Sequence, residues 1–368
     1  MGFDGSHNAA PYMKYIEKQA PGDERKGPWI KLFIEVVQNF KDGNSTLISA
    51  YIDSLQTTNQ HFYFDAVVHL TTEDHDLRYA QISDTLYRMF GLWTLLENYF
   101  EPHSAAFAYI KQVGEKGNCE TLGSLVKASN LLPSPREAEP FQSLVSARQV
   151  HASLESQSID QTRLNAFRLR AYANTKIHWT TNISRHMILS QRAGCHYLEL
   201  FALPCALENR SKEGLGTIGL SSTLVYEIRD SYTYLFNSPK PSFLHQVVFR
   251  SMGARWWCLC LSCSSRRLLA REIRDGMSEI LDKKSLPASK DFEHQSDLPW
   301  SQSKYRNLWP RIIKLDAHLQ KARPWGFWIL FRDRRDTVQF WTFLFGSVIL
   351  ILTFIQVALG VAQVVGAF

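Results

Sequence analysis

The stretch RDRRDTVQFWTFLFGSVILILTFIQVALGVAQVVGAF, residues 332–368, decides the fold that we expect of this chain. It contains no charged side chain after Asp336. A helix that crosses the hydrocarbon layer of a bilayer needs about 20 apolar residues. The uncharged run is long enough for one such crossing with some tilt, and it is too short for two. The sequence therefore predicts a single transmembrane helix over residues 337–368.

Basic residues are concentrated just before this run. Residues 301–335 hold nine of the 41 Lys and Arg residues of the chain, whereas residues 1–300 carry equal numbers of the two signs. Such an excess is typical of the cytoplasmic flank of a membrane span, where Lys and Arg are retained and attract anionic lipids. We therefore expect residues 304–336 to form a basic juxtamembrane segment. The side chains predicted to lie at the membrane interface are Trp325, Trp328, Arg332, Arg334 and Arg335.

This charge distribution also predicts an orientation. With its basic flank before an apolar run at the C-terminal end of the sequence, the chain is expected to be a single-pass, tail-anchored membrane protein. Its body is expected to face the cytosol from the endoplasmic reticulum or a later membrane of the secretory pathway. The first 28 residues lack the apolar stretch of a secretory signal peptide, which favours the same orientation. Membrane lipids are then the first expected partner.

Polar and small residues in the predicted span recur every three or four positions, so they share one helical face. The parallel face is almost wholly apolar. Small residues allow two helices to approach closely, and amides can form hydrogen bonds between them. The pattern predicts self-association through the span, with glutamines and glycines merely tolerated in a lone helix as the alternative. The residues predicted to pack are Thr353, Gln356, Gly360 and Gln363.

The rest of the chain is predicted to be mainly α-helical with a small β-hairpin portion. Apolar residues at helical spacing predict helices over residues 27–40, 83–100 and 222–236. Proline-rich and polar stretches predict linkers between helical regions. The expected organisation is a flexible N-terminus over 1–26, a helical region over 27–130, a linker over 131–158, a helix with a hairpin and long helices over 159–283, and a second linker over 284–303.

The region 159–283 has the pattern of a winged helix, in which a helix is followed by a β-hairpin. A helical stretch at 163–172 precedes three short alternating runs, of which the last two flank the turn sequence QRAG at 191–194. A winged helix raises nucleic acid as a partner. The basic excess of this region is modest and is not gathered in one patch, so no nucleic acid is expected to bind.

Two local motifs suggest chemistry. Gly214, Gly216 and Gly219 fit the spacing of a dinucleotide-binding loop, but the preceding residues are polar and do not form the apolar strand that such a loop requires. The second motif is a cysteine cluster in the sequence CLCLSC, which lacks a second cluster to complete a zinc site. Its thiols are expected either to be buried beside tryptophans or to be acylated near the membrane. They are Cys258, Cys260 and Cys263.

Other signatures of catalysis are missing from the sequence. The histidines are dispersed and show no metal-ligand spacing, and neither a nucleophile-elbow motif nor a phosphate-binding loop is found. We therefore expect no metal and no cofactor. Three sequons begin at Asn44, Asn182 and Asn209, and they would matter only if the body faced the lumen.

Four segments resemble a family of uncharacterised filamentous-fungal proteins with a single C-terminal transmembrane span. They are WTTNISRHMILS (179–190), YLELFALPCAL (197–207), WWCLCLSC (256–263) and the block from Leu308 to Thr353. The resemblance implies a fungal membrane protein. It implies no activity and assigns no catalytic residue.

These patterns favour a cytosol-facing interaction module or scaffold with an unidentified protein partner. The alternative is a membrane-tethered enzyme, accessory to a fungal biosynthetic gene cluster, whose site is assembled from residues that no linear motif reveals. A deep pocket with convergent titratable groups would favour the enzyme, and a shallow body with an exposed apolar patch would favour the scaffold.

Overall fold

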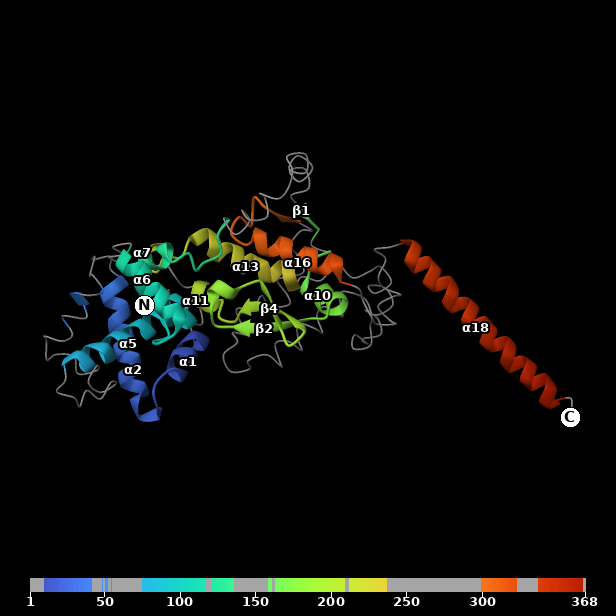
Figure 1. Ribbon diagram of the computed structural model, residues 1–368, viewed down its shortest axis with the longest axis horizontal. Coiled ribbons are helices and arrows are strands. Elements are labelled where there is room, and N and C mark those ends of the chain that lie inside the picture. Colours follow the sequence, from blue (N-terminus) through green and yellow to red (C-terminus); the bar gives the residue numbers. More distant parts are fainter. Residues whose placement is uncertain are drawn as a thin grey trace, which may run out of the picture.

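The structure of the protein is a computed structural model. It describes residues 10–41, 48, 50, 51, 54, 75–116, 121–135, 158–160, 163–208, 212–236, 299–322 and 337–366. Most of the described chain is helical, and it contains two small β-sheets and a long apolar helix at its C-terminal end (Figure 1). The predicted fold class, mainly α-helical with a small β portion and a long apolar C-terminal helix, is confirmed at this level.

The described residues between 10 and 128 form mainly helices. They are α1 (Ala10–Lys18), the 3-10 helix η1 (Asp23–Arg25), α2 (Lys26–Lys41), α5 (His75–Thr94), the 3-10 helix η2 (Glu97–Tyr99), α6 (Ala105–Lys116) and α7 (Leu122–Ala128). The helix predicted over 27–40 is confirmed as α2. Its apolar residues recur at the spacing that places them on one face, and this face is buried. The buried residues of α2 are Trp29, Leu32, Phe33, Val36, Val37 and Phe40.

The structure corrects the prediction of a flexible N-terminus over residues 1–26. Residues 10–18 form α1, which buries Tyr12, Tyr15 and Ile16. The Tyr12 hydroxyl donates a hydrogen bond to the carbonyl of Leu92 at 3.1 Å, and the Tyr15 hydroxyl donates to the carboxylate of Glu97. Most residues of α1 are polar, so its apolar face is not evident in the sequence. Tertiary contacts stabilise this short helix.

The helix predicted over 83–100 is α5, but its end differs from the prediction. The α-helix stops at Thr94 because Leu95 adopts a positive φ of 62°. The chain then turns back across the last helical turn and passes close to Gly91. A Cβ atom at Gly91 would lie 2.9 Å from the Cβ of Phe100, so this position requires glycine.

The larger sheet contains three strands in the order β2-β4-β3, with β2 at Thr175–Thr180, β3 at Ile188–Arg192 and β4 at Cys195–Phe201. The predicted hairpin is confirmed as the antiparallel pair β3 and β4. Ala193 and Gly194 join them with φ values of 48° and 75°, which suit the right-handed twist of a two-residue hairpin. Strand β2 pairs parallel to β4, which was not predicted.

Helix α10 (Ala166–Ala173) precedes this sheet, and α16 (Trp309–Lys321) packs against one face of it. The His196 ring from β4 lies 4.4 Å from the His318 ring of α16, centroid to centroid. The Nε2 atom of His318 also lies 3.2 Å from the Oγ1 atom of Thr175, the first residue of β2. The beginnings of two strands and the last turn of α16 therefore meet at one end of the body.

Three helices follow the sheet: α11 (Cys205–Glu208), α12 (Lys212–Thr217) and α13 (Ser222–Phe236). The predicted helix 222–236 is confirmed with the same bounds. The segment with the glycine motif, residues 214–219, packs closely against α7. A Cβ atom at Gly123 in α7 would lie 2.8 Å from the carbonyl oxygens of Gly216 and Thr217. Gly219 has a φ of 77° and approaches the carbonyl of Gly123. Backbone proximity therefore accounts for Gly123 and Gly219, whereas a Cβ at Gly216 would meet no atom within 4 Å.

The smaller sheet joins two segments that are far apart in the sequence. Strand β1 (Ser158–Ile159) pairs antiparallel to β5 (Trp300–Ser301). Trp300 is fully buried, and its indole N–H donates to the carbonyl of Leu164 at 3.1 Å. The structure thus corrects the predicted linker 284–303 at its C-terminal end, where Trp300 is part of the core.

Candidate functional site: the apolar C-terminal helix and the elements that lead to it

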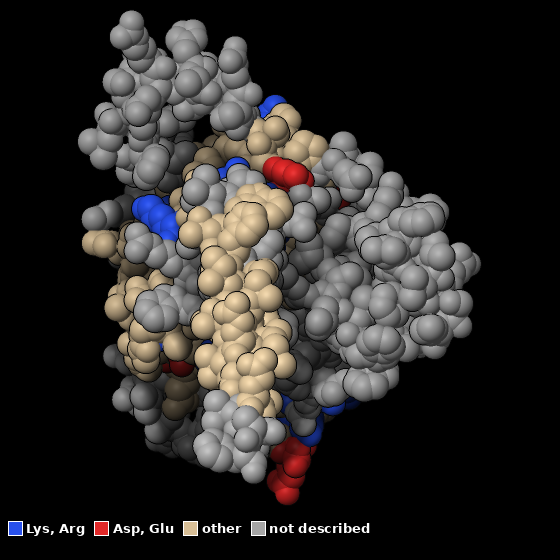
Figure 2. All heavy atoms as spheres, turned by 90° about the vertical axis from the view of Figure 1, so that its right-hand side faces the viewer, with Lys and Arg blue, Asp and Glu red and all other residues tan. Residues whose placement is uncertain are grey.

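The last described element is α18 (Thr337–Gly366), an uncharged helix of 30 residues. At about 1.5 Å per residue it is about 45 Å long, which exceeds the thickness of a hydrocarbon layer and allows tilt. Its segment Phe345–Gln363 has a mean hydropathy of 2.3, and none of it is buried. Figure 2 shows no charged side chain on the described side of α18 that faces the viewer. Among the described residues, this one helix is long and apolar enough to cross a membrane.

The residues predicted to pack against another helix all lie on α18 and are exposed: Thr353, Gln356, Gly360 and Gln363. The Thr353 hydroxyl donates to the carbonyl of Ile349 at 2.8 Å, which satisfies it within the helix. A Cβ atom at Gly360 would meet no atom within 4 Å. Close packing against the described residues therefore does not require glycine at this position.

The predicted membrane-interface residues Trp325, Trp328, Arg332, Arg334 and Arg335 lie outside the described residues. The same is true of the cysteine cluster Cys258, Cys260 and Cys263. The structure does show an aromatic pair that we did not single out from the sequence. The rings of Trp341 and Phe345 stack at 5.7 Å near the start of α18, and both side chains are exposed. An aromatic pair at the start of an apolar run was a usable signal for an interfacial position.

Helix α16 leads the chain toward this end, and its start is fixed by a carboxylate from α13. Its N-cap residue, Leu308, makes no side-chain capping bond. Glu227 takes over this function by accepting hydrogen bonds from the backbone N–H groups of Asn307 at 3.0 Å and Leu308 at 2.9 Å. A negative charge at a helix N-terminus is stabilised by the helix dipole. The signal in the sequence was a glutamate at helical spacing from Leu224, on the apolar face of the predicted helix.

The structure corrects the prediction that residues 304–336 form a juxtamembrane segment. Trp309–Lys321 is a helix packed in the body, and Arg311 is buried. Its guanidinium donates to the carbonyls of Ser184 at 2.7 Å and His186 at 2.6 Å. Lys304 forms an ion pair with Asp230 at 2.7 Å. These two cations stabilise the fold, so the predicted basic segment is smaller than the sequence suggested.

His186 and Ser231 form the closest approach to a catalytic pair in the described core. The Nε2 atom of His186 lies 2.7 Å from the hydroxyl oxygen of Ser231. The backbone N–H of Phe201 donates to Nδ1 of His186, so Nε2 carries the proton, and the Ser231 hydroxyl donates to the carbonyl of Ile228. A nucleophilic serine must instead donate to the histidine. In this pair the histidine donates to the serine, which is the reverse of the hydrogen bond that a nucleophilic serine needs.

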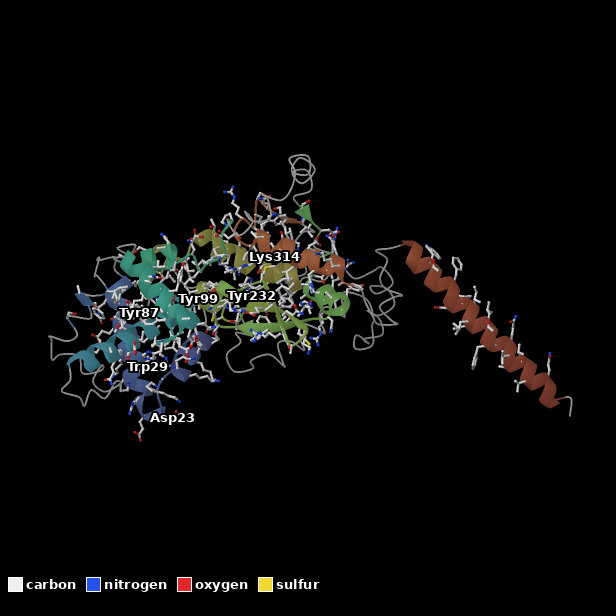
Figure 3. The ribbon with its side chains drawn as sticks, viewed as in Figure 1. Asp23, Trp29, Tyr87, Tyr99, Tyr232 and Lys314 are labelled. Carbon is white, nitrogen blue, oxygen red and sulfur yellow. The ribbon has the colours of Figure 1, made fainter. Side chains whose placement is uncertain are left out.

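The surroundings of His186 also favour a structural function. Burial, together with the nearby charge of Arg311, lowers the pKa of His186 to about 3. Both His186 and Ser231 are fully buried, and Tyr232, which follows Ser231, lies in the interior of the body (Figure 3). The histidine is consequently neutral at physiological pH and joins α13 to the sheet.

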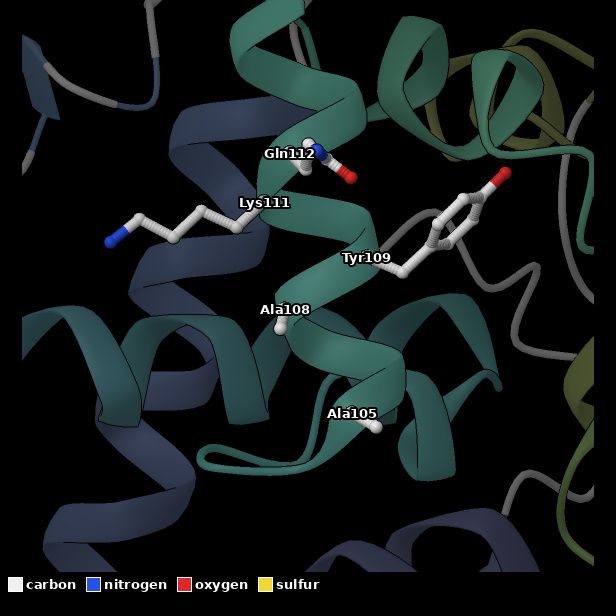
Figure 4. A pocket seen from close by; sticks show the side chains of 5 residues that line it. All are labelled: Ala105, Ala108, Tyr109, Lys111 and Gln112. Carbon is white, nitrogen blue, oxygen red and sulfur yellow. The ribbon is translucent and has the colours of Figure 1, made fainter.

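The described surface has a shallow depression on α6. Its lining consists of Ala105, Ala108, Tyr109, Lys111 and Gln112, which all belong to this one helix (Figure 4). The side chain of Tyr109 is 47% exposed. Titratable groups from several elements do not converge there, and the described residues contain no cluster of three side chains suited to hold a metal ion. This shallow depression resembles a contact surface more than an enclosed small-molecule site.

No protein-family model matches the chain, and neither a curated protein nor a solved structure shows significant similarity to it.

Proposed function

We propose that the protein is a cytosol-facing, tail-anchored membrane protein that acts as an interaction module or scaffold. The observation that carries this proposal is α18, whose apolar surface is uncovered, whereas in the described body the exposed large apolar side chains are Tyr109, Tyr226 and Ile313. Exposed apolar surface on this scale belongs in lipid or against another apolar helix. The basic residues before α18 favour a cytosolic body.

The finer assignments stay predictions. They are the winged-helix likeness of α10 and the hairpin, the membrane of the endoplasmic reticulum or later secretory pathway, acylation of the cysteine cluster, and the relation to filamentous-fungal proteins. The shallow depression on α6 supports a scaffold over an enzyme.

The first test addresses orientation. A tag fused before Met1 is expected to be digested when protease is added to intact microsomes, because the body lies on the outer side. The sequons at Asn44 and Asn209 are expected to stay unmodified. Asn182 is expected to stay unmodified as well. A protected tag, or a change in size after endoglycosidase treatment, would reverse the orientation.

The second test addresses self-association through α18. Replacing Gln356 and Gln363 with leucine removes two amides whose hydrogen bonds across a helix interface contribute roughly 0.6–2 kcal/mol each. Gly360→Ile adds bulk where close approach is expected. We expect each change to reduce the signal of a membrane two-hybrid or energy-transfer assay, while insertion is retained.

Val361→Ile is the matched control, because it adds one methylene group on the predicted lipid-facing side. This variant is expected to associate like the original chain. Equal signals from all the variants would contradict self-association and leave α18 as a lone anchor.

A further inference from the structure

Helix α18 is longer than one crossing of a bilayer requires. It is a single unbroken helix of 30 residues (Figure 1), and its length is about 45 Å. A hydrocarbon layer about 30 Å thick could hold all of it only at a tilt of about 48°, whereas helices in membranes tilt by about 20° on average and by at most about 40°. At the average tilt, about 21 residues are sufficient. About nine residues of α18 therefore extend beyond the hydrocarbon.

The sequence of α18 indicates which of its ends extends. Half of its first six positions are polar, and these residues are Thr337, Gln339 and Thr342. Among its last nine positions, 358–366, the one polar residue is Gln363. The segment with the hydropathy of a span, Phe345–Gln363, also lies toward the C-terminal end of the helix. Polar groups are costly within hydrocarbon, so the start of α18 is the part that leaves it.

An aromatic pair marks the place where α18 leaves the hydrocarbon. The rings of Trp341 and Phe345 stack at 5.7 Å, and their side chains are 50% and 59% exposed. Tryptophan is enriched at the level of the lipid headgroups, because its ring is apolar and carries one polar N–H group. A span of about 21 residues that ends at Gln363 begins at residue 343, which places Trp341 about 3 Å outside the hydrocarbon.

The polar residue at the middle of this span is satisfied within the helix. Residues 343–363 are centred on Thr353, whose hydroxyl donates to the carbonyl of Ile349 at 2.8 Å. A hydroxyl without a partner would be costly at the bilayer centre, and this hydrogen bond reduces that cost. The position of Thr353 is therefore compatible with a span over residues 343–363.

We propose that α18 crosses the membrane at a fixed depth, at which residues 343–363 span the hydrocarbon and the first six residues form a helical stalk with Trp341 in the lipid headgroup layer. This inference rests on the proposed membrane span. The stalk is about 9 Å long, and the headgroup layer on each side of a bilayer is about 5–8 Å thick. The stalk therefore crosses this layer and holds the start of α18 at its boundary with water.

The test measures depth with the full chain in phosphatidylcholine nanodiscs. Trp341 or Phe354 is replaced by a fluorescent naphthyl amino acid, and quenching by phospholipids brominated at different acyl carbons gives the distance of this probe from the bilayer centre. At position 341 we expect about 17 Å, compared with about 10 Å for a helix that lies wholly within the hydrocarbon at a steep tilt. Position 354 is the control, because both arrangements place it within about 3 Å of the centre.

Two deletions of four residues each, 349–352 and 337–340, separate these arrangements, and they rotate the rest of the helix equally. Deletion of 349–352 shortens the spanning part, so the probe at position 341 is expected to move about 6 Å toward the bilayer centre. Deletion of 337–340 shortens only the stalk and is expected to leave the probe in place. A helix wholly within the hydrocarbon would give the reverse, because the second deletion would then move the probe outward.

Two results would overturn the proposed depth. One is a probe at position 341 that lies about 10 Å from the centre, and the other is a probe that stays in place when residues 349–352 are deleted. Extraction of the unmodified chain by alkaline carbonate would contradict the membrane span itself, so the failure of the span is distinguishable from the failure of the depth.

Discussion

Deletion of residues 337–368 is expected to move the protein completely from the carbonate-resistant membrane fraction to the soluble fraction. Among the described residues, α18 is the one helix that satisfies the length and hydropathy of a membrane span. Leu, Ile, Phe and Val each favour insertion at the centre of a span by about 0.3–0.6 kcal/mol, and their contributions add along the helix. The measurement is alkaline carbonate extraction followed by immunoblotting.

The same deletion is expected to leave the fold of the body intact. The apolar segment of α18 buries nothing against the rest of the described chain, so its loss opens no cavity. The truncated protein should therefore show the same protease-resistant fragments as the full chain. A truncated chain that still resists carbonate extraction would contradict the anchor.

Substitution of Arg311 by methionine is expected to destabilise the body by about 3 kcal/mol or more. A hydrogen bond from a charged group contributes about 1.5–3 kcal/mol, and Arg311 donates to two buried carbonyl oxygens. Methionine keeps the apolar part of the side chain but supplies no donor. The measurement is the urea or thermal unfolding transition of the chain in detergent, followed by near-ultraviolet circular dichroism.

Lys314→Met is the matched control on the same helix. Lys314 is exposed and lies on the outer side of α16 (Figure 3). A substitution at such a position usually changes stability by less than about 0.5 kcal/mol. Similar losses for both variants would mean that Arg311 has no special structural function, and the correction to the predicted basic segment would then fail.

Elements with a strong local period were predictable from the sequence. The apolar spacing of α2 and α13, the turn between β3 and β4 and the uncharged run of α18 each lie within one short window. Helix α1 was missed because its few apolar residues are informative only together with the surfaces that bury them. Local pattern favours a surface position for a basic residue, and so it could not separate buried Arg311 from exposed Lys314.

Long-range pairing was beyond the same reasoning. Strand β2 pairs with β4, and β1 pairs with β5. The sequence of each strand contains no pattern that identifies the strand with which it pairs. The network of Glu227 at the start of α16 is likewise a contact across 80 residues. The one indication of this contact in the sequence was the position of Glu227 on an apolar helical face.

The contact between α13 and β5 has a consequence for the tolerance of the chain to changes in length. The Tyr234 ring, in the last turn of α13, lies 4.9 Å from the Trp300 ring, so two residues far apart in the sequence are in contact within the core. The contact between these two buried rings therefore closes the chain between them into a loop. The entropic cost of closing such a loop rises by only about 0.6 kcal/mol for each doubling of its length. A change in the number of residues between Tyr234 and Trp300 is therefore expected to cost little stability as long as the contact between the two rings is kept.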